Sequence, residues 1–427
     1  MNSKLALLGG NPVRRAPYPQ HGTMIGEEEE REVIEVLRGQ HLSGFSGTNT
    51  PRFYGGVKVR ALEAAFAEKF VVRHAVSVNS ATSALHCAVA ATGVEPGEEI
   101  ITSPYTMSAT ASAILMQNAV PVFADIDDET FCLDPESVEK VVTPRTRAIL
   151  AVNLFGHPSS LDELKTIADK HDLMLIEDNA QAPLAKYRDR FTGTIGAIGI
   201  QSLNYHKTIQ TGEGGIALTD DPELALHMQL KRNHGEVVIG PMGREDLNNM
   251  IGFNYRLTEV CAAIGLPQLE KLEMLHEIRH RLAEQLTWQL TEFDFLTPPK
   301  VADGCTHAYY QYAMKFNERR AGVSRSLFAE AIRAEGISIA EGYVRPVYLE
   351  PMYQRRSAYG SGHFPFGREK DVSYKEGICP VVERLWRSEL LTTDICKHPN
   401  TEREVEEFVQ AVEKVSKSME QLRSMKQ

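Results

Sequence analysis

The chain has 427 residues, of which 42% are hydrophobic, so it can bury a large core and form two domains. Its formal net charge is −11 and it has no long block of lysine and arginine, which argues against a nucleic-acid partner. No apolar run reaches the ~18 residues of a membrane span and no signal-peptide pattern opens the sequence, so we expect a cytoplasmic protein with no membrane partner.

From residue 75 onward, apolar strand-like runs alternate with helical patterns. The predicted strands cover residues 75–80, 98–103, 121–127, 147–155, 173–178, 197–203 and 215–219. The predicted helices among them cover residues 81–93, 106–118, 161–171 and 221–234. This alternation predicts a mostly parallel sheet with right-handed crossovers, whose ligand site lies at the C-terminal ends of the strands.

The rest of the chain changes character near residue 287. Residues 252–286 are expected to be helical, with an interruption near Gly265 to Pro267. Beyond them we expect strands at residues 307–316 and 337–344, a helix at 324–336, and a C-terminal helix at 401–422. That last helix carries a capping-box pattern and an apolar stripe. The sequence therefore predicts a large α/β domain, residues 1–286, and a smaller α+β domain, residues 287–427.

The stretch from residue 197 to residue 220 is the most informative part of the chain. Its two apolar runs flank a polar insert that contains Lys207 and the glycines Gly212, Gly214 and Gly215. Glycine permits positive φ and close backbone approach, so the second run can turn back tightly beside the lysine. Because burial disfavours an ammonium and lowers its pKa, a lysine held in such a loop suits Schiff-base chemistry.

Upstream of this loop, a second predicted strand ends in carboxylates. The apolar run at residues 173–178 ends in Glu177 and Asp178, where open α/β sheets place their ligand sites. Pyridoxal 5′-phosphate (PLP) needs a lysine to hold its aldehyde and a carboxylate to keep its ring nitrogen protonated. The segments EDNAQA and HKTIQTGEGG, with Asp178 29 residues before Lys207, resemble the DegT/StrS family of sugar aminotransferases. The resemblance extends from about residue 10 to the C-terminus.

The resemblance implies a fold-type I PLP-dependent transferase, similar to aspartate aminotransferase, with a mostly parallel sheet in its large domain and a smaller C-terminal α+β domain. It also implies that Lys207 holds PLP, that Asp178 pairs with the ring nitrogen and that Gln181 reaches the phenolic oxygen. The positions implied for the phosphate are Ala81, Thr82, Ser202 and Asn254. Residues 79–83 lie between a strand and a helix, where backbone amides favour an anion.

Two positions depart from the family pattern. Ala81 stands where the family usually has glycine, and Met107 stands where it commonly has the aromatic residue that stacks on the ring, with Tyr105 as a possible substitute. In the family, the asparagine at position 254 reaches the phosphate of the neighbouring subunit, which implies a homodimer with shared active sites. Candidate substrate residues, beside the lysine loop or in segments that match the family's site, are His206, Glu213, His307 and Tyr343.

The predicted reaction transfers an amino group from L-glutamate or L-glutamine to a keto group of a sugar, nucleotide-sugar or cyclitol. The segment at residues 341–353 and the leader most resemble the branch that acts on keto-cyclitols with glutamine as donor. A PLP-dependent sugar dehydratase on the same fold is an alternative, but relatives of that kind have histidine in place of the lysine at position 207.

A zinc hydrolase is the alternative from another class. His276, Glu277 and His280 match the H-E-x-x-H motif, in which two helix histidines bind zinc and the glutamate is the base, and Glu284 is a conceivable third ligand. Arg279 within the motif would place a cation beside the metal. A charged face on a helix explains the motif more simply, so we expect no metal site.

Overall fold

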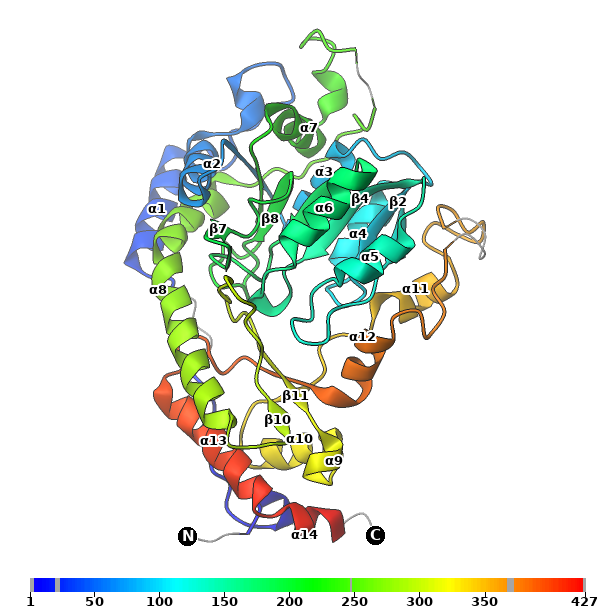
Figure 1. Cartoon of the computed structure of the whole chain (residues 1–427). Helices are drawn as coiled ribbons and strands as arrows, with labels where there is room; N and C mark the ends of the chain where they lie inside the picture. The colour runs from blue at the N-terminus through cyan, green and yellow to red at the C-terminus, as the bar shows by residue number, and fades with distance from the viewer. Residues whose placement is uncertain (1–3, 20–23, 246–247, 367–371, 425–427) are drawn as a thin grey trace.

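A seven-stranded sheet forms the centre of the computed structural model, which describes residues 4–19, 24–245, 248–366 and 372–424 (Figure 1). In sheet order its strands are β1 (His74–Val78), β9 (Gly215–Thr219), β8 (Ile198–Ser202), β5 (Met174–Asp178), β4 (Thr146–Val152), β2 (Glu99–Thr102) and β3 (Val120–Phe123). Strand β9 runs antiparallel to its two neighbours, and all other adjacent strands are parallel. The predicted mostly parallel sheet is confirmed.

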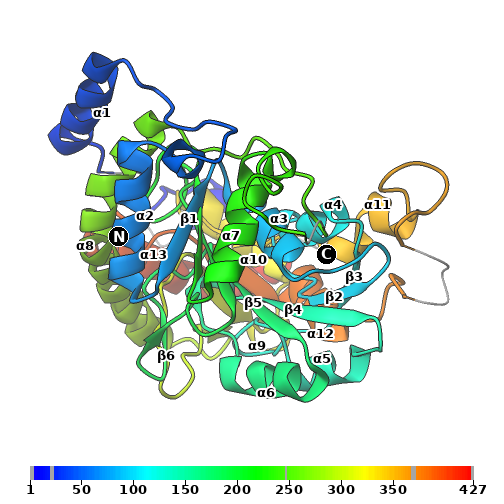
Figure 2. The ribbon, with the colours of Figure 1, turned by 90° about the horizontal axis from the view of Figure 1, so that it is seen from above.

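Helices cover both faces of this sheet (Figure 2). One face carries α3 (Ala81–Ala91), α4 (Ala109–Met116) and α7 (Pro222–Arg232), and the other carries α5 (Pro135–Val141) and α6 (Leu161–His171). At the β1 end, α1 (Glu27–Gly39) and α2 (Val57–Phe70) pack against the long helix α8 (Glu259–Leu290). A short hairpin of β6 (Lys186–Tyr187) and β7 (Arg190–Phe191) follows β5. Within the described residues, no helix is long and apolar enough to cross a membrane.

The predicted interruption near Gly265 to Pro267 is wrong, because α8 continues through Pro267. A proline removes a backbone donor from the helix interior, so packing must compensate. Gly265 lies so close to α2 that a Cβ there would be 3.0 Å from Leu62 Cδ1. One turn on, Gln268 Nε2 donates to Glu29 Oε1 of α1 at 2.8 Å. Contacts with these two helices account for the continuity of α8.

The C-terminal part of the chain forms a second, antiparallel sheet. Its strands, in sheet order, are β10 (Leu296–Thr297), β11 (Tyr312–Phe316), β13 (Leu390–Thr393) and β12 (Ala340–Glu341). Its helices are α9 (Glu318–Ala321), α10 (Arg325–Ala334), α11 (Pro351–Gln354), α12 (Pro380–Arg384), α13 (Glu402–Ser416) and α14 (Met419–Ser424). The predicted capping box begins α13, where Thr401 N donates to Glu404 Oε2 at 2.9 Å.

Two strands predicted in this part are shorter than expected. Residues 307–316 contribute only β11, because Tyr309 adopts φ +47° and Ala308 N donates to Gly156 O at 2.8 Å instead of joining a sheet. Residues 337–344 contribute only β12, because the chain turns at Gly342, where φ is +72°. Both irregular segments contact the large domain: Ala308 N donates to Gly156 O, and Tyr343 N donates to Tyr105 Oη at 3.0 Å.

Two main clusters of buried apolar side chains lie around the two sheets. The first surrounds the seven-stranded sheet, and the second lies among the small sheet, α10, α13 and the C-terminal half of α8. Leu5 from the N-terminal leader belongs to the second cluster. Helix α8 runs alongside both parts and passes residue 286 (Figure 1). The first cluster also contains side chains from beyond residue 287, such as Tyr348, Tyr353 and Leu390, so the division at residue 286 stays a prediction.

Candidate active site

Three segments singled out in the sequence meet at one edge of the large sheet. Strands β1, β5 and β8 run in the same direction, so their C-terminal ends lie at the same edge. Asp178 ends β5, the loop with Lys207 follows β8, and α3 begins directly after β1. This is the edge where open α/β sheets bind ligands.

Asp178 and its neighbour Glu177 are both buried but have different partners. Asp178 Oδ2 accepts from Thr110 Oγ1 at 2.9 Å, and Oδ1 accepts from Ala180 N at 3.2 Å. Burial raises the pKa of Asp178, while these donors and the nearby charge of Lys207 lower it. Glu177 instead accepts from three backbone amides, those of residues 193, 195 and 196. Asp178 therefore faces the site, and Glu177 anchors the loop before β8.

The amine of Lys207 is enclosed at the same edge. Its Nζ lies 4.4 Å from the ring centroid of Tyr310, which comes from the irregular segment before β11. Burial lowers the pKa of Lys207 to about 8, Asp178 opposes the shift and Arg279 adds to it. A lysine with such a pKa is partly neutral near physiological pH, as a nucleophilic amine requires.

The start of α3 offers amides for an anion. The Ser80 side chain caps the helix by accepting from Ser83 N at 3.1 Å, while the first amides of a helix have no partner within it. A Cβ at Gly215 would lie 2.6 Å from Ala81 N, so only glycine lets β9 approach this helix start so closely. Thr82 and, at the end of β8, Ser202 are both partly exposed.

A hydrogen-bond network connects Gln181 with the C-terminal part of the chain. Gln181 Oε1 accepts from Phe155 N at 2.9 Å, and Nε2 donates to Tyr343 Oη at 3.0 Å. Tyr343 N donates to Tyr105 Oη at 3.0 Å, and the Tyr105 ring is fully buried against Phe155 and Tyr343. The possible substitute for the stacking residue is thus packed in the core, and Met107 is 58% exposed.

The remaining predicted residues lie in different surroundings. His206 and Glu213 are exposed on the lysine loop, where Asn204 Nδ2 donates to Glu213 at 2.8 Å. His307 is only 3% exposed, and its ring stacks on Tyr309 at 4.2 Å. Burial lowers the pKa of His307 well below its usual value, which fits a packed neutral imidazole. Asn254 is exposed, with its side chain turned to Arg256 Nε at 2.7 Å.

Sequence reasoning missed three residues of this site. Thr110 donates to Asp178, Tyr310 lies against Lys207, and Arg279 donates to the Tyr309 and Tyr310 carbonyls at 3.1 and 3.2 Å. Threonine in a helix start and tyrosine in a strand-like run are common, so their residue types gave no signal. In the sequence, Arg279 stands out only as a cation within the H-E-x-x-H pattern.

The residues of the H-E-x-x-H pattern all lie on α8. The rings of His276 and His280 are 6.3 Å apart, and His280 Nδ1 pairs with Glu284 Oε1 at 3.4 Å. In the described ranges, no group of three or more His, Cys, Asp or Glu side chains could hold a metal ion. Arg279 points into the protein from the same helix, which leaves the motif as a helix face.

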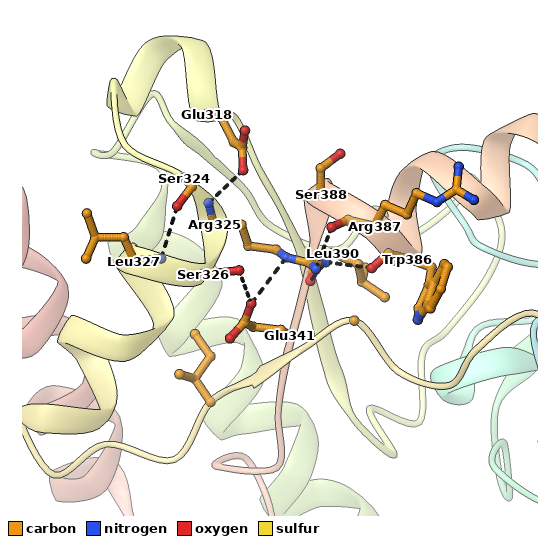
Figure 3. Close-up of polar contacts among 12 residues, drawn as sticks. Glu318, Ser324, Arg325, Ser326, Leu327, Glu341, Trp386, Arg387, Ser388 and Leu390 are labelled. Carbon is orange, nitrogen blue, oxygen red and sulfur yellow. Dashed lines mark hydrogen bonds and ion pairs between the residues drawn. The ribbon is translucent and has the colours of Figure 1, made fainter. Parts of the chain in front are cut away.

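Arg325 of α10 points toward the backbone around Trp386, Arg387 and Leu390 (Figure 3). Its buried guanidinium donates at 2.8 to 3.3 Å to four backbone carbonyls, those of Leu385, Trp386, Arg387 and Leu390. The Leu390 carbonyl also accepts from Gly342 N at 2.7 Å, one residue before Tyr343. Arg325 therefore joins the π-helical segment Leu385–Glu389 to the segment after β12 that carries Tyr343.

We expect Arg325→Ala to lower the free energy of unfolding by about 3 kcal/mol, because several buried carbonyls lose their donor at once. Arg333→Ala is the matched control, because both arginines lie near Glu341. Arg333 pairs with Glu341 at 3.0 Å and Arg325 lies 4.0 Å from it, but the Arg333 side chain is far more exposed. Its loss should cost less than about 1 kcal/mol. Denaturant titration of both variants measures the difference, and equal losses would contradict the anchoring role.

Comparisons with known proteins agree with this geometry. The model of the DegT/DnrJ/EryC1/StrS aminotransferase family matches residues 24–384. An L-glutamine:2-deoxy-scyllo-inosose aminotransferase of Streptoalloteichus tenebrarius is 34% identical over 437 residues, covering 98% of this chain and 99% of that protein.

Two solved structures share the fold. DesI, solved in the presence of its TDP-sugar product, superposes with a TM-score of 0.82 at 26% identity over 99% of this chain and 98% of DesI. S. venezuelae DesV, in complex with a ketimine intermediate, gives a TM-score of 0.77 at 29% identity, covering 91% of this chain and 94% of DesV. With its mostly parallel sheet, its enclosed lysine amine and a family match that spans most of its length, the chain belongs to the DegT/DnrJ/EryC1/StrS aminotransferase family.

Proposed function

We propose that this protein is a PLP-dependent aminotransferase that moves an amino group from L-glutamate or L-glutamine to a keto group of a sugar or cyclitol. The observation that carries the proposal is the enclosed Lys207 amine, whose pKa is lowered to about 8, at the same sheet edge as the buried Asp178. Family membership supports the reaction class. The name of the 34% identical relative favours glutamine as donor and a keto-cyclitol as acceptor.

The residues at this edge fit PLP. The cofactor needs an amine for its aldehyde, an acid opposite its ring nitrogen and amides for its phosphate, and Lys207, Asp178 and the start of α3 offer these groups at one edge. When bound, PLP carries the amino group between donor and acceptor, and its ring takes up the electron pair left when a carbon loses a proton. The close approach of Gly215 to Ala81 leaves the phosphate position without a side chain from β9.

Each residue has a distinct task in this proposal. Lys207 would hold the cofactor through its aldehyde and, when its amine is free, would move a proton from the donor's Cα to the cofactor. Asp178, oriented by Thr110 and by Ala180 N, would keep the proton on the ring nitrogen. Gln181 Nε2 is the donor proposed for the phenolic oxygen. Ala81 N, the Thr82 N–H and hydroxyl, and the Ser202 hydroxyl are proposed to bind the phosphate.

We propose that the protein works as a homodimer with shared active sites. Asn254 is exposed in the single chain, as a residue that reaches a partner's phosphate must be. Met107 is also largely exposed and is the proposed contact for the ring, because thioether sulfur interacts favourably with aromatic systems. His206, Glu213 and Tyr343 are proposed to face the substrates. His307 is proposed to have an indirect role: its ring stacks on Tyr309 and so holds the neighbouring backbone in place.

A single turnover without acceptor tests the reaction class and the donor. PLP-loaded protein is mixed with L-glutamine or, separately, with L-glutamate, and the keto acid formed is quantified by mass spectrometry. We expect one equivalent of keto acid per chain from one of the donors, with loss of the visible cofactor band. Addition of a keto-cyclitol should then restore the band. Absence of keto acid with both donors would contradict the proposal.

A further inference from the structure

Tyr310 lies against the lysine amine and has no task in the proposed reaction. The Lys207 Nζ is 4.4 Å from the centre of the Tyr310 ring, well within the ~6 Å range of a cation–π interaction. The charged or titratable groups that act on this amine are Asp178 on β5, Arg279 on α8 and His206 on its own loop. The Lys207 amine therefore contacts the ring at a place where one carboxylate and two basic side chains also interact electrostatically with the amine.

The backbone that carries this ring is fixed in a conformation that non-glycine residues seldom adopt. Tyr309 has φ +47°, in the left-handed region. Its N–H donates to His307 Nδ1 at 2.8 Å, and its ring stacks on the His307 ring at 4.2 Å. Gly156 makes room beside it, because a Cβ on Gly156 would lie 2.8 Å from Tyr309 N. Such strain persists only where the surroundings hold it in place.

Arg279 supplies the strongest of these restraints. Its Nη1 donates to two successive carbonyls, those of Tyr309 and Tyr310, at 3.1 and 3.2 Å. Arg279 is buried, so these bonds are shielded from water, and charge-assisted bonds are stronger than neutral ones. Holding both carbonyls determines the direction in which the Tyr310 side chain leaves the backbone. A buried arginine on α8 thus determines where the aromatic ring meets the lysine.

We infer that Tyr310 is a positioning residue that receives the free amine of Lys207 on its ring face whenever the lysine is not bonded to the cofactor, and that Arg279 fixes the ring for this purpose. The inference rests on the proposed function, because a lysine that holds PLP is released by the donor and taken back in each turnover. The ring face attracts the ammonium and gives the released amine a defined position. The phenol hydroxyl has no part in this role.

The test measures the pKa of Lys207 in the protein without PLP. Competitive acetylation with acetic anhydride across pH, read by mass spectrometry, gives this pKa for the wild type, Tyr310→Phe and Tyr310→Leu. We expect Tyr310→Phe to match the wild type, because it keeps the ring. Tyr310→Leu should lower the pKa of Lys207 by about one unit, because the ring no longer stabilises the ammonium. At a pH below the pKa, the neutral fraction of Lys207 should then be roughly tenfold larger than in the wild type.

A second lysine near an aromatic ring, the buried Lys231, provides the internal control. Burial also lowers the pKa of Lys231, whose Nζ lies 5.2 Å from the Phe253 ring. Because the variants leave Phe253 in place, the reactivity of Lys231 should be the same in all of them. If a change at Lys231 shows that Tyr310→Leu is misfolded, Tyr310→Met, which also lacks a ring, takes its place. An unchanged Lys207 pKa without the ring, or an equal shift in Tyr310→Phe, would overturn the inference.

The visible band of the PLP-loaded wild type tests the proposed function separately. A wild-type band together with an unshifted Lys207 in Tyr310→Leu overturns the positioning role alone. A wild type that forms no band with PLP overturns the proposed function, whatever the pKa of Lys207.

Discussion

Lys207→Met is expected to abolish turnover and, at the same time, to stabilise the protein without PLP. Turnover should fall by about four orders of magnitude or more, because the variant loses the group that binds the aldehyde and carries the proton. The free energy of unfolding at pH 7 should be about 2 kcal/mol higher for the variant than for the wild type. The reason is that an ammonium shielded from water is replaced by an apolar side chain of similar length. Asp178 loses a nearby positive charge in the variant, which offsets part of the gain.

The pH dependence of this gain follows from the pKa of Lys207. In the folded chain the pKa is about 8, below the ordinary value of 10.5, so the unfolded chain binds more protons between these two values. Wild-type stability therefore rises with pH across this window. The advantage of Lys207→Met should be complete below pH 8 and should disappear by about pH 10.5.

Denaturant titrations at pH 7 and near pH 10 measure this effect, with Lys165→Met as the control. Lys165 is an exposed lysine paired with Asp169 at 2.8 Å, so its replacement should change stability by less than about 0.5 kcal/mol at either pH. A Lys207→Met variant that keeps turnover, or that is less stable than the wild type at pH 7, would contradict the assigned role and environment of the lysine.

Replacing each of two adjacent carboxylates should have opposite consequences. Asp178→Asn is expected to lower kcat on the order of 100-fold or more with little change in stability, because an amide cannot keep the ring nitrogen protonated. Glu177→Gln should leave the kcat of the folded protein nearly unchanged but lower its stability by about 2 kcal/mol. The variant replaces one carboxylate oxygen, which accepts from backbone N–H groups, with an NH₂ group. The NH₂ group cannot accept and would face those donors.

Steady-state kinetics and denaturant titration of both variants separate the two roles. The pair is a stringent test because the residues are adjacent on one strand and are both buried. If Glu177→Gln lowered kcat as much as Asp178→Asn does, the assignment of Asp178 as the partner of the ring would be wrong.

The alternating pattern of the sequence was enough to predict the large sheet and most of its helices. Strand β9 and helix α6, for example, cover the residues predicted for them. The prediction failed where tertiary contacts override local preference. Pro267 suggested an interruption, but packing against α1 and α2 carries α8 through it. The run at residues 307–316 has strand-like composition, but Arg279 and Gly156 hold its first half in an irregular conformation.

The same distinction applies to the site. Lys207 and Asp178 could be predicted because their residue types and spacing carry the chemistry. Thr110 and Tyr310 could not, since their contribution comes from the partner that each one touches, and those partners are distant in sequence. Only the folded chain shows which threonine donates to Asp178 and which ring meets the lysine.

The most direct test of the central claim is to locate the covalent bond to PLP. The protein is incubated with PLP, reduced with borohydride, digested and examined by mass spectrometry, with Lys207→Met treated in parallel. We predict a yellow protein that yields one modified lysine per chain, at Lys207, and no modification at this site after a reactive donor has bleached the band. A colourless protein, or modification at other lysines such as Lys231 with Lys207 untouched, would contradict the account.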